Sequence, residues 1–175
     1  PSDQQFLPDN LMMAADSNRN GRLVLSSQNL YALEPQSSGK NWFSPFVFFS
    51  CLLLFFILLH FTLGKKYPLL MAGFDGMLFF VTGLLGIILL FMWFATDHSM
   101  TKNNYNLLWA LPTHLIGSFF ITSKQSRVKK YFLSTSAAGI LLLLAWYFLH
   151  QQLNTALVPF VLLLIFRAYT IASRK

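Results

Sequence analysis

Between the apolar runs of this chain, chemically useful side chains are densest from Trp93 to Leu115. Those that could bind or activate a substrate are acidic, imidazole, amide and indole groups: Asp97, His98, Asn104, Asn106, Trp109 and His114. A histidine beside a carboxylate can act as an oriented base, because the carboxylate fixes the tautomer and stabilises the imidazolium. Asparagine and tryptophan at a membrane interface can bind a lipid headgroup or a glycerol ester. Neighbouring residues rarely point together, however, so Asp97-His98 alone does not define a catalytic pair.

The same stretch also fits a loop without chemistry. In that interpretation its acidic, hydroxyl or amide side chains cap the two flanking helices. Tyr105 and Trp109 then belong to the aromatic belt that membrane proteins carry at the interface. The three asparagines within four positions, 103, 104 and 106, keep the functional interpretation open beside this one.

His114 stands inside an apolar run, two residues after Pro112. Pro112 removes one helix hydrogen bond and predicts a kink at that point. An ionisable group in hydrocarbon is costly, so one interpretation is a neutral His114 bonded to a threonine, a serine or a freed carbonyl. A haem ligand is the other, although His60, His98 and His150 do not match its depth on a neighbouring helix. We expect no cofactor, and the sequence contains no metal-ligand spacing.

These side chains must be positioned by a scaffold that lies in a membrane. Of the 175 residues, 55% are hydrophobic and 11% are charged, against about 25% charged residues in ordinary soluble domains. Five apolar runs follow one another, at 42–63, 69–95, 105–121, 131–149 and 155–172. Each is near the roughly 17–25 residues that a helix needs to cross a bilayer. Backbone groups in lipid must be satisfied within the segment, so we predict an all-α membrane protein, a bundle of five transmembrane helices.

The basic residues between these runs predict the orientation. They gather after the first, third and fifth runs: Lys65, Lys66, Lys124, Arg127, Lys129, Lys130, Arg174 and Lys175. The other two loops hold Lys102, offset by Asp97, and no basic residue at 150–154. Because short cytoplasmic loops are enriched in lysine and arginine, we expect the N-terminus outside and the C-terminus inside. The net charge of +7 is then a topology signal, and we expect no nucleic-acid partner.

Residues 1–41 differ from the apolar remainder, 42–175, which we expect to be the transmembrane domain. They carry four of the six acidic residues. A proline followed by DNLMMAADS indicates a short helix, and Asn20-Gly21 indicates a hairpin turn between two short strands. So small a piece cannot bury a core alone, and we expect it to be the end of an extracytoplasmic domain plus a linker. Its export requires a signal, so we expect the chain to be the C-terminal part of a longer protein.

A few small or polar residues within the apolar runs predict how the helices pack. Asp75 and His60 lie at similar depth in consecutive runs, so they could pair across the helix hairpin. Gly83 and Gly86, with the other glycines of the second run, indicate close helix packing. Cys51 has no basic neighbour in its apolar run, so we interpret it as an inert buried thiol and not as a nucleophile.

The stretch TDHSMTKNNYNLLWALPTHL resembles the membrane half of the Lnb-type bacterial lipoprotein N-acyltransferases. A histidine after an aromatic helix end, a polar spacer, N-x-N-L-L-W and a proline carry the resemblance: His98, Asn104, Asn106, Leu107, Leu108, Trp109 and Pro112. FLPDNLMMAADS, near the start of the chain, is similar to the end of that family's head domain. The likeness is specific over the first of these stretches and loose over the rest of the chain.

The resemblance implies lipid chemistry at the outer leaflet of the bacterial inner membrane, with the N-terminal segment in the periplasm. In such enzymes a cysteine of an extracytoplasmic, cysteine-peptidase-like head, with a histidine, takes an acyl chain from a phospholipid. It passes that chain to the N-terminal cysteine of a lipoprotein. The head is absent from this chain, so the resemblance implies a membrane part that presents substrate and is inactive alone. Its partners would be membrane lipid, bacterial lipoproteins and the head, and His98, Asn104, Asn106 and Trp109 would form the lipid-facing floor.

Two other functions remain open. The chain could be a passive membrane anchor or assembly module for an extracytoplasmic domain, in which case the 96–106 loop would tolerate substitution. It could instead be a small haem or quinone membrane protein, and a Soret band of the purified chain would reveal the haem version.

Overall fold

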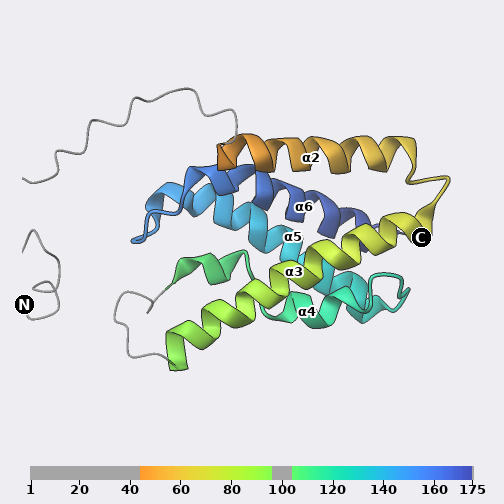
Figure 1. The fold of residues 1–175 in the computed structure, drawn as a ribbon. Helices are drawn as coiled ribbons and strands as arrows, with labels where there is room; N and C mark the ends of the chain where they lie inside the picture. Colours follow the sequence, from red (N-terminus) through yellow and green to blue (C-terminus); the bar gives the residue numbers. More distant parts are fainter. Residues whose placement is uncertain (1–43, 96–103, 175) are drawn as a thin grey trace, which may run out of the picture. The chain divides into compact units, whose positions relative to one another are not determined.

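The computed structural model describes residues 44–95 and 104–174, and every regular element within these ranges is helical (Figure 1). In chain order the elements are α2 (Pro45–Thr62), α3 (Pro68–Ala95), η3 (Tyr105–Leu108), α4 (Thr113–Ser118), α5 (Ser126–Ala145), η4 (Trp146–Phe148), η5 (Thr155–Leu157) and α6 (Val158–Ala172). The α labels denote α-helices and the η labels short 3-10 helices. The helix and hairpin predicted within residues 1–41 lie outside the described residues.

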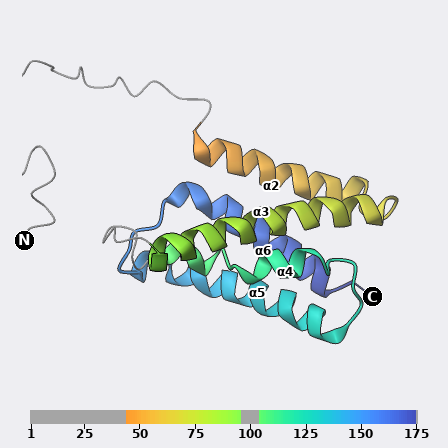
Figure 2. The same ribbon diagram turned by 60° about the horizontal axis from the view of Figure 1, so that its bottom comes forward.

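Four helical stretches are long and apolar enough to cross a membrane: Pro45–Thr62, Pro68–Ala95, Ser126–Phe148 and Thr155–Ala172. The last two each join an α-helix to a short 3-10 helix. The four stretches run up and down beside one another (Figures 1 and 2). The predicted all-α membrane bundle is therefore confirmed in the part of the chain that the structure describes.

Prolines and capping side chains set where these helices begin. Ser44 caps α2, because its Oγ accepts the backbone N–H of Val47 at 3.3 Å, and Pro45 fills the first helical position. Pro68 opens α3 in the same way. Asn154 caps η5 by accepting the backbone N–H of Ala156 at 2.9 Å. The apolar runs continue as helices from these start signals.

The third apolar run, 105–121, is not the single helix that its hydropathy predicts. It is divided into η3 and α4, with residues 109–112 in turns between them. Pro112 has no backbone N–H and its ring would clash with the carbonyl four residues earlier, so a regular helix cannot pass this point. Upstream, Asn104 Oδ1 accepts the backbone N–H of Asn106 at 3.1 Å, a local bond that competes with helix formation. We call residues 104–121 the broken segment.

The core of the bundle forms around α6. Eight of the 15 residues of α6 are buried, whereas Phe56 is the one buried residue among the 18 of α2. Phe79 of α3 and Phe132 of α5 pack in the same core and are both fully enclosed. α2 lies at the edge and touches the core through aromatic rings: the centroids of Phe49 and Phe160 are 5.1 Å apart.

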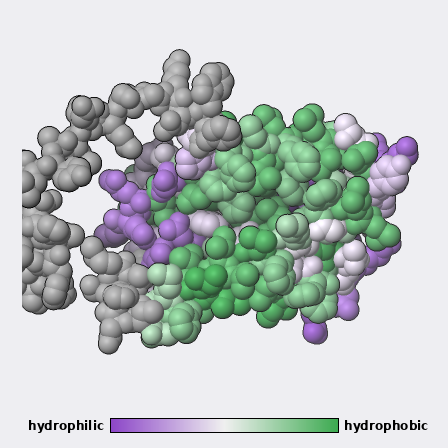
Figure 3. Space-filling view, in the orientation of Figure 1, coloured by the Kyte–Doolittle hydropathy of each residue, from purple (hydrophilic) through white to green (hydrophobic). Residues whose placement is uncertain are grey.

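The outside of the described bundle has the polarity that a bilayer requires. A hydrophobic belt covers its middle, and hydrophilic residues gather at its two ends (Figure 3). Large exposed apolar side chains come from each of the long helices, among them Leu58, Phe91, Leu141 and Leu162. Such a surface is unfavourable in water and matches the hydrocarbon interior of a membrane.

Two buried glycines of α3 let the broken segment lie directly on that helix. A Cβ on Gly83 would collide with the backbone at Leu115, and a Cβ on Gly86 would collide with the backbone at Ala110. The predicted close packing is confirmed for this pair. By contrast, a Cβ on Gly73 would meet no atom within 4 Å.

Alanine at Gly83 or Gly86 should therefore destabilise the bundle by about 1–3 kcal/mol, because two backbones would have to separate. Alanine at Gly73 is the matched control. It adds the same methyl group to the same helix in open space and should be neutral or stabilising by up to about 1 kcal/mol, from helix propensity. Thermal unfolding of the purified protein in detergent measures both effects. Equal melting temperatures for the Gly73 and Gly83 variants would contradict the close contact.

Candidate functional site

The predicted site residues Asn104, Asn106 and Trp109 form one hydrogen-bonded chain at the start of the broken segment. The Asn106 side-chain nitrogen donates to Asn104 Oδ1 at 2.9 Å, and Trp109 Nε1 donates to Asn106 Oδ1 at 2.9 Å. The 3-10 helix η3 has three residues per turn, which places residues 106 and 109 on the same side. The local backbone therefore brings these three side chains together.

A contact from the connection between α5 and α6 fixes this chain in place. Gln151 Oε1 accepts the backbone N–H of Tyr105 at 2.6 Å. The bond joins residues that are 46 positions apart, and it confirms that the two connections share one end of the bundle. We call Asn104, Asn106, Trp109 and Gln151 the amide–indole network.

His114 is buried in α4 and bonded to a residue that the sequence analysis did not single out. Its Nδ1 lies 2.7 Å from the hydroxyl of Tyr131 on α5, and that hydroxyl lies 3.1 Å from Thr113 Oγ1. Phe79 packs on the imidazole edge to face, with the ring centroids 5.1 Å apart. The partner is a hydroxyl, as one interpretation of the sequence required, but tyrosine supplies it. Tyr131 stands at the first position of the fourth apolar run. Its polar hydroxyl at that position was the one feature of the sequence that pointed to it.

Trp109 and His114 line the same small cavity. Its volume is about 20 Å³, and Phe79 and Leu111 are among the other residues that line it. A space of this size can hold a single water molecule. The four described candidate residues thus all lie on the broken segment. Three of them belong to the network and two line this cavity, with Trp109 belonging to both.

The network leaves amide donors available to a ligand. Within residues 44–95 and 104–174, the side-chain nitrogen of Asn104 makes no hydrogen bond and that of Asn106 makes one. Asn104 is half-buried, so a ligand can reach it. Amide N–H groups donate well to phosphate and ester oxygens. The geometry therefore provides free donors with which a ligand can be bound and oriented.

The other predicted groups add no reactive centre to the described part of the chain. Asp97 and His98 lie outside the described residues. Cys51 is exposed on α2, and the expectation of a buried thiol is wrong, because α2 turns most of its surface away from the core. Among the described residues, no three His, Cys, Asp or Glu side chains are placed to hold a metal ion.

The opposite end of the bundle carries a buried ion pair that the sequence analysis missed. Arg167 of α6 donates from Nε and Nη2 to the two oxygens of Asp75 on α3, at 2.6 and 2.9 Å. Arg174 Nη2 reaches the same carboxylate at 2.6 Å. Asp75 and Arg167 are 0% and 1% exposed. Arg167 Nη1 lies 3.3 Å from His60 Nδ1, so the predicted direct pair of His60 with Asp75 is wrong: Arg167 is the carboxylate's partner.

The sequence did contain a signal for this pair. Arg167 follows the apolar stretch VPFVLLLIF and precedes AYTIA, so it lies inside a membrane-spanning run. A charge in hydrocarbon needs an opposite charge beside it, and Asp75 is the carboxylate inside another run. Arg167 also lies near the basic chain end at Arg174 and Lys175, so its charge can equally be assigned to the topology signal.

In a comparison with known protein families, residues 36–174 match a family model described as the Lnb transmembrane domain. The matched range contains every helix described above, the amide–indole network and the ion pair. No curated protein and no solved structure matches the chain.

Removing Asp75 alone should destabilise the protein more than removing the whole ion pair. Asp75→Leu leaves Arg167 buried without a carboxylate, which costs about 3–5 kcal/mol. Asp75→Leu with Arg167→Leu leaves no buried charge, so its unfolding temperature should lie closer to that of the wild type. Thermal unfolding in detergent provides the measurement. Arg174→Leu is the control, because Arg174 is the more exposed of the two arginines that bind Asp75. A double variant as unstable as the summed single variants would refute this account.

Proposed function

This chain belongs to the Lnb transmembrane domain family, and from that membership we propose that it is the membrane domain of a bacterial extracytoplasmic acyltransferase. The enzyme acts on lipoproteins and takes its acyl chain from a phospholipid. The catalytic thiol belongs to a head domain that the described residues do not include. The observation that carries the binding role is the amide–indole network, with its unused amide donors at one end of the bundle.

The arrangement of the helices supports an outward-facing network. α2 begins at the end of the bundle where η3 and the connection between α5 and α6 lie (Figures 1 and 2). The loops rich in lysine and arginine lie at the other end, after α2 and before α5. Because basic loops stay in the cytoplasm, the network faces the periplasm across the inner membrane. A domain joined ahead of α2 then attaches on the network side.

In this proposal the membrane domain binds lipid and the head domain reacts with it. Asn104 donates to phosphate or ester oxygens of the phospholipid, and Asn106 holds Asn104 and Trp109 in position. The thiolate of the head's cysteine attacks the ester carbonyl, so that a thioester forms and a lysophospholipid leaves. The amino group of the lipoprotein's N-terminal cysteine then attacks the thioester, which forms the amide and restores the thiol.

Asn106→Ala in the full-length protein should lower lipoprotein N-acylation by about tenfold or more, because misplaced binding groups weaken orientation of the ester. The substitution removes the acceptor of Trp109 Nε1 and the donor to Asn104 Oδ1. Mass spectrometry of the lipoprotein's N-terminal peptide measures the product, which carries one additional acyl chain. His98→Ala tests the predicted contribution of the preceding loop in the same assay.

Asn154→Ala is the matched control for this experiment. It also deletes an asparagine cap at the same end of the bundle, but its partner is Ala156 and no member of the network. Acylation by this variant should remain at the wild-type level. Wild-type acylation by Asn106→Ala and His98→Ala would remove both residues from the site. Full activity after replacement of the bundle by unrelated helices would establish the passive anchor instead.

A further inference from the structure

A pocket of about 710 Å³ opens at the end of the bundle opposite the amide–indole network. Five parts of the chain form its wall: the last turn of α2 with the loop after it, the start of α3, the stretch between α4 and α5, the start of α5 at Lys129, and the end of α6. These parts lie together near the C-terminal end in Figure 1. The volume falls within the roughly 300–1,000 Å³ typical of sites for small molecules.

Positive charge dominates this pocket. Five of its lining residues are basic: Lys65, Lys124, Lys129, Arg167 and Arg174. Within residues 44–95 and 104–174 the sequence holds one acidic residue, Asp75, and the two arginines already bind it. The described part of the chain therefore leaves most of the charge in this pocket without a counter-ion.

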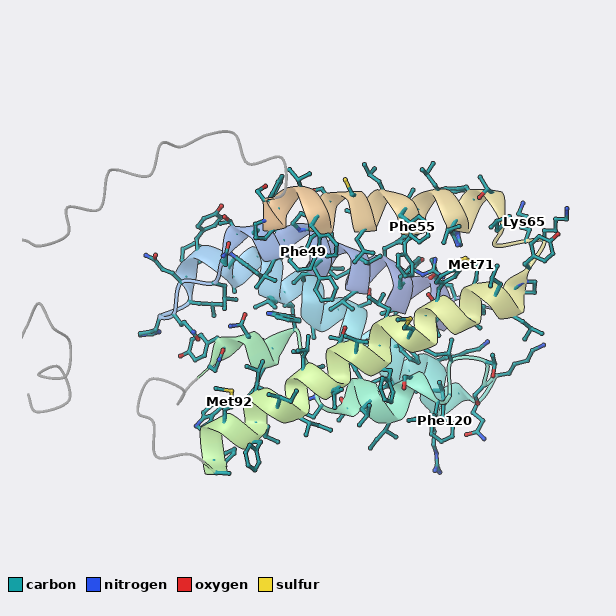
Figure 4. All side chains as sticks on the ribbon, in the orientation of Figure 1. Phe49, Phe55, Lys65, Met71, Met92 and Phe120 are labelled. Carbon is teal, nitrogen blue, oxygen red and sulfur yellow. The ribbon has the colours of Figure 1, made fainter. Side chains whose placement is uncertain are left out.

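Two of the lysines are available to a ligand. Lys65 and Lys124 are exposed, and neither forms a hydrogen bond or ion pair with another described residue. Lys65 projects from the turn after α2 (Figure 4). Lys129 differs from them, because its Nζ donates to the backbone carbonyl of Arg174 and so holds the chain end against α5. Arg174 uses one guanidinium nitrogen on Asp75 and has further N–H donors.

The remainder of the pocket wall is largely apolar. Phe61 comes from α2, Leu69 and Met71 from α3, Ile121 from the end of the broken segment and Ile171 from α6. A ligand that fits both parts of the wall has an anionic group for the lysines and a hydrocarbon part for these side chains. A phospholipid has this combination, and free phosphate lacks the second half of it.

We propose that this pocket binds an anionic phospholipid, with the headgroup phosphate between Lys65, Lys124 and Arg174. Basic pockets between transmembrane helices bind anionic headgroups on the cytoplasmic side of membranes. The bilayer supplies such lipids at the depth of the pocket, next to its apolar wall. This site is distinct from the amide–indole network, since it lies at the other end of the bundle. The lipid that it holds stabilises or regulates the domain.

Binding of phosphatidylglycerol to the full-length protein in neutral detergent tests this proposal, with native mass spectrometry as the readout. The variant Lys65→Gln/Lys124→Gln should bind phosphatidylglycerol about 30-fold more weakly, because each basic side chain near an anionic lipid changes affinity about fivefold. The wild type should prefer phosphatidylglycerol to zwitterionic phosphatidylcholine, and the variant should lose this preference. Both lysines are exposed, so circular dichroism should show an unchanged fold.

Lys66→Gln/Lys130→Gln is the control, since it removes the same charge from two exposed lysines at the same end that do not line the pocket. It should leave the binding of phosphatidylglycerol nearly unchanged. Equal weakening in both double variants would show diffuse surface attraction and overturn the proposal. Displacement of the lipid by inorganic phosphate alone would assign the site to a free anion and overturn it as well. Neither lysine of the tested pair belongs to the amide–indole network, so this outcome is independent of the acylation assay.

Discussion

A buried charge is tolerated in hydrocarbon when its partner is fixed, and this requirement sets the arrangement of the bundle. Arg167 faces both oxygens of Asp75 with two nitrogens, the bidentate geometry that holds a guanidinium and a carboxylate in one relative orientation. A slip of α3 against α6 by one turn would separate the two groups and leave each without compensation. The pair therefore fixes the register of the two helices. Arg174 and His60 extend the same constraint to the chain end and to α2.

The broken segment lies on α3, the same helix that the ion pair fixes. Irregular backbone is tolerated at membrane depth where protein covers it, and α3 provides this cover because Gly83 and Gly86 let the backbone of residues 110–115 approach. Because the helix is interrupted at Pro112, Trp109 lies in a turn and not within a regular α-helix. The same feature that breaks the helix thus creates the place where amide, indole and imidazole groups meet.

The sequence predicted the features that depend on composition and local pattern. Long apolar runs identified the membrane helices. The spacing of Gly83 and Gly86 predicted the close packing that the structure shows between α3 and the broken segment. Hydropathy wrongly predicted a single helix over 105–121. It averages across residues, so it does not reflect the local hydrogen bonds of Asn104 or the missing N–H donor of Pro112.

The sequence also could not show which side chains contact each other. The partners of Asp75 and His114 come from 92 and 17 positions away, and such distances are decided by the packing of whole helices.

The edge position of α2 gives the bundle a mechanical property. Residues 1–43 join the bundle through this helix, which buries one residue and touches the core through rings such as Phe49 on Phe160 and Phe55 on Phe74. Ring contacts of this kind resist separation, yet they lack the directional bonds that would lock the angle between helices. Load applied from the N-terminal side therefore reaches α2 before it reaches the other described helices. His60, near the other end of α2, lies 3.3 Å from Arg167, so this load is passed on to the buried ion pair.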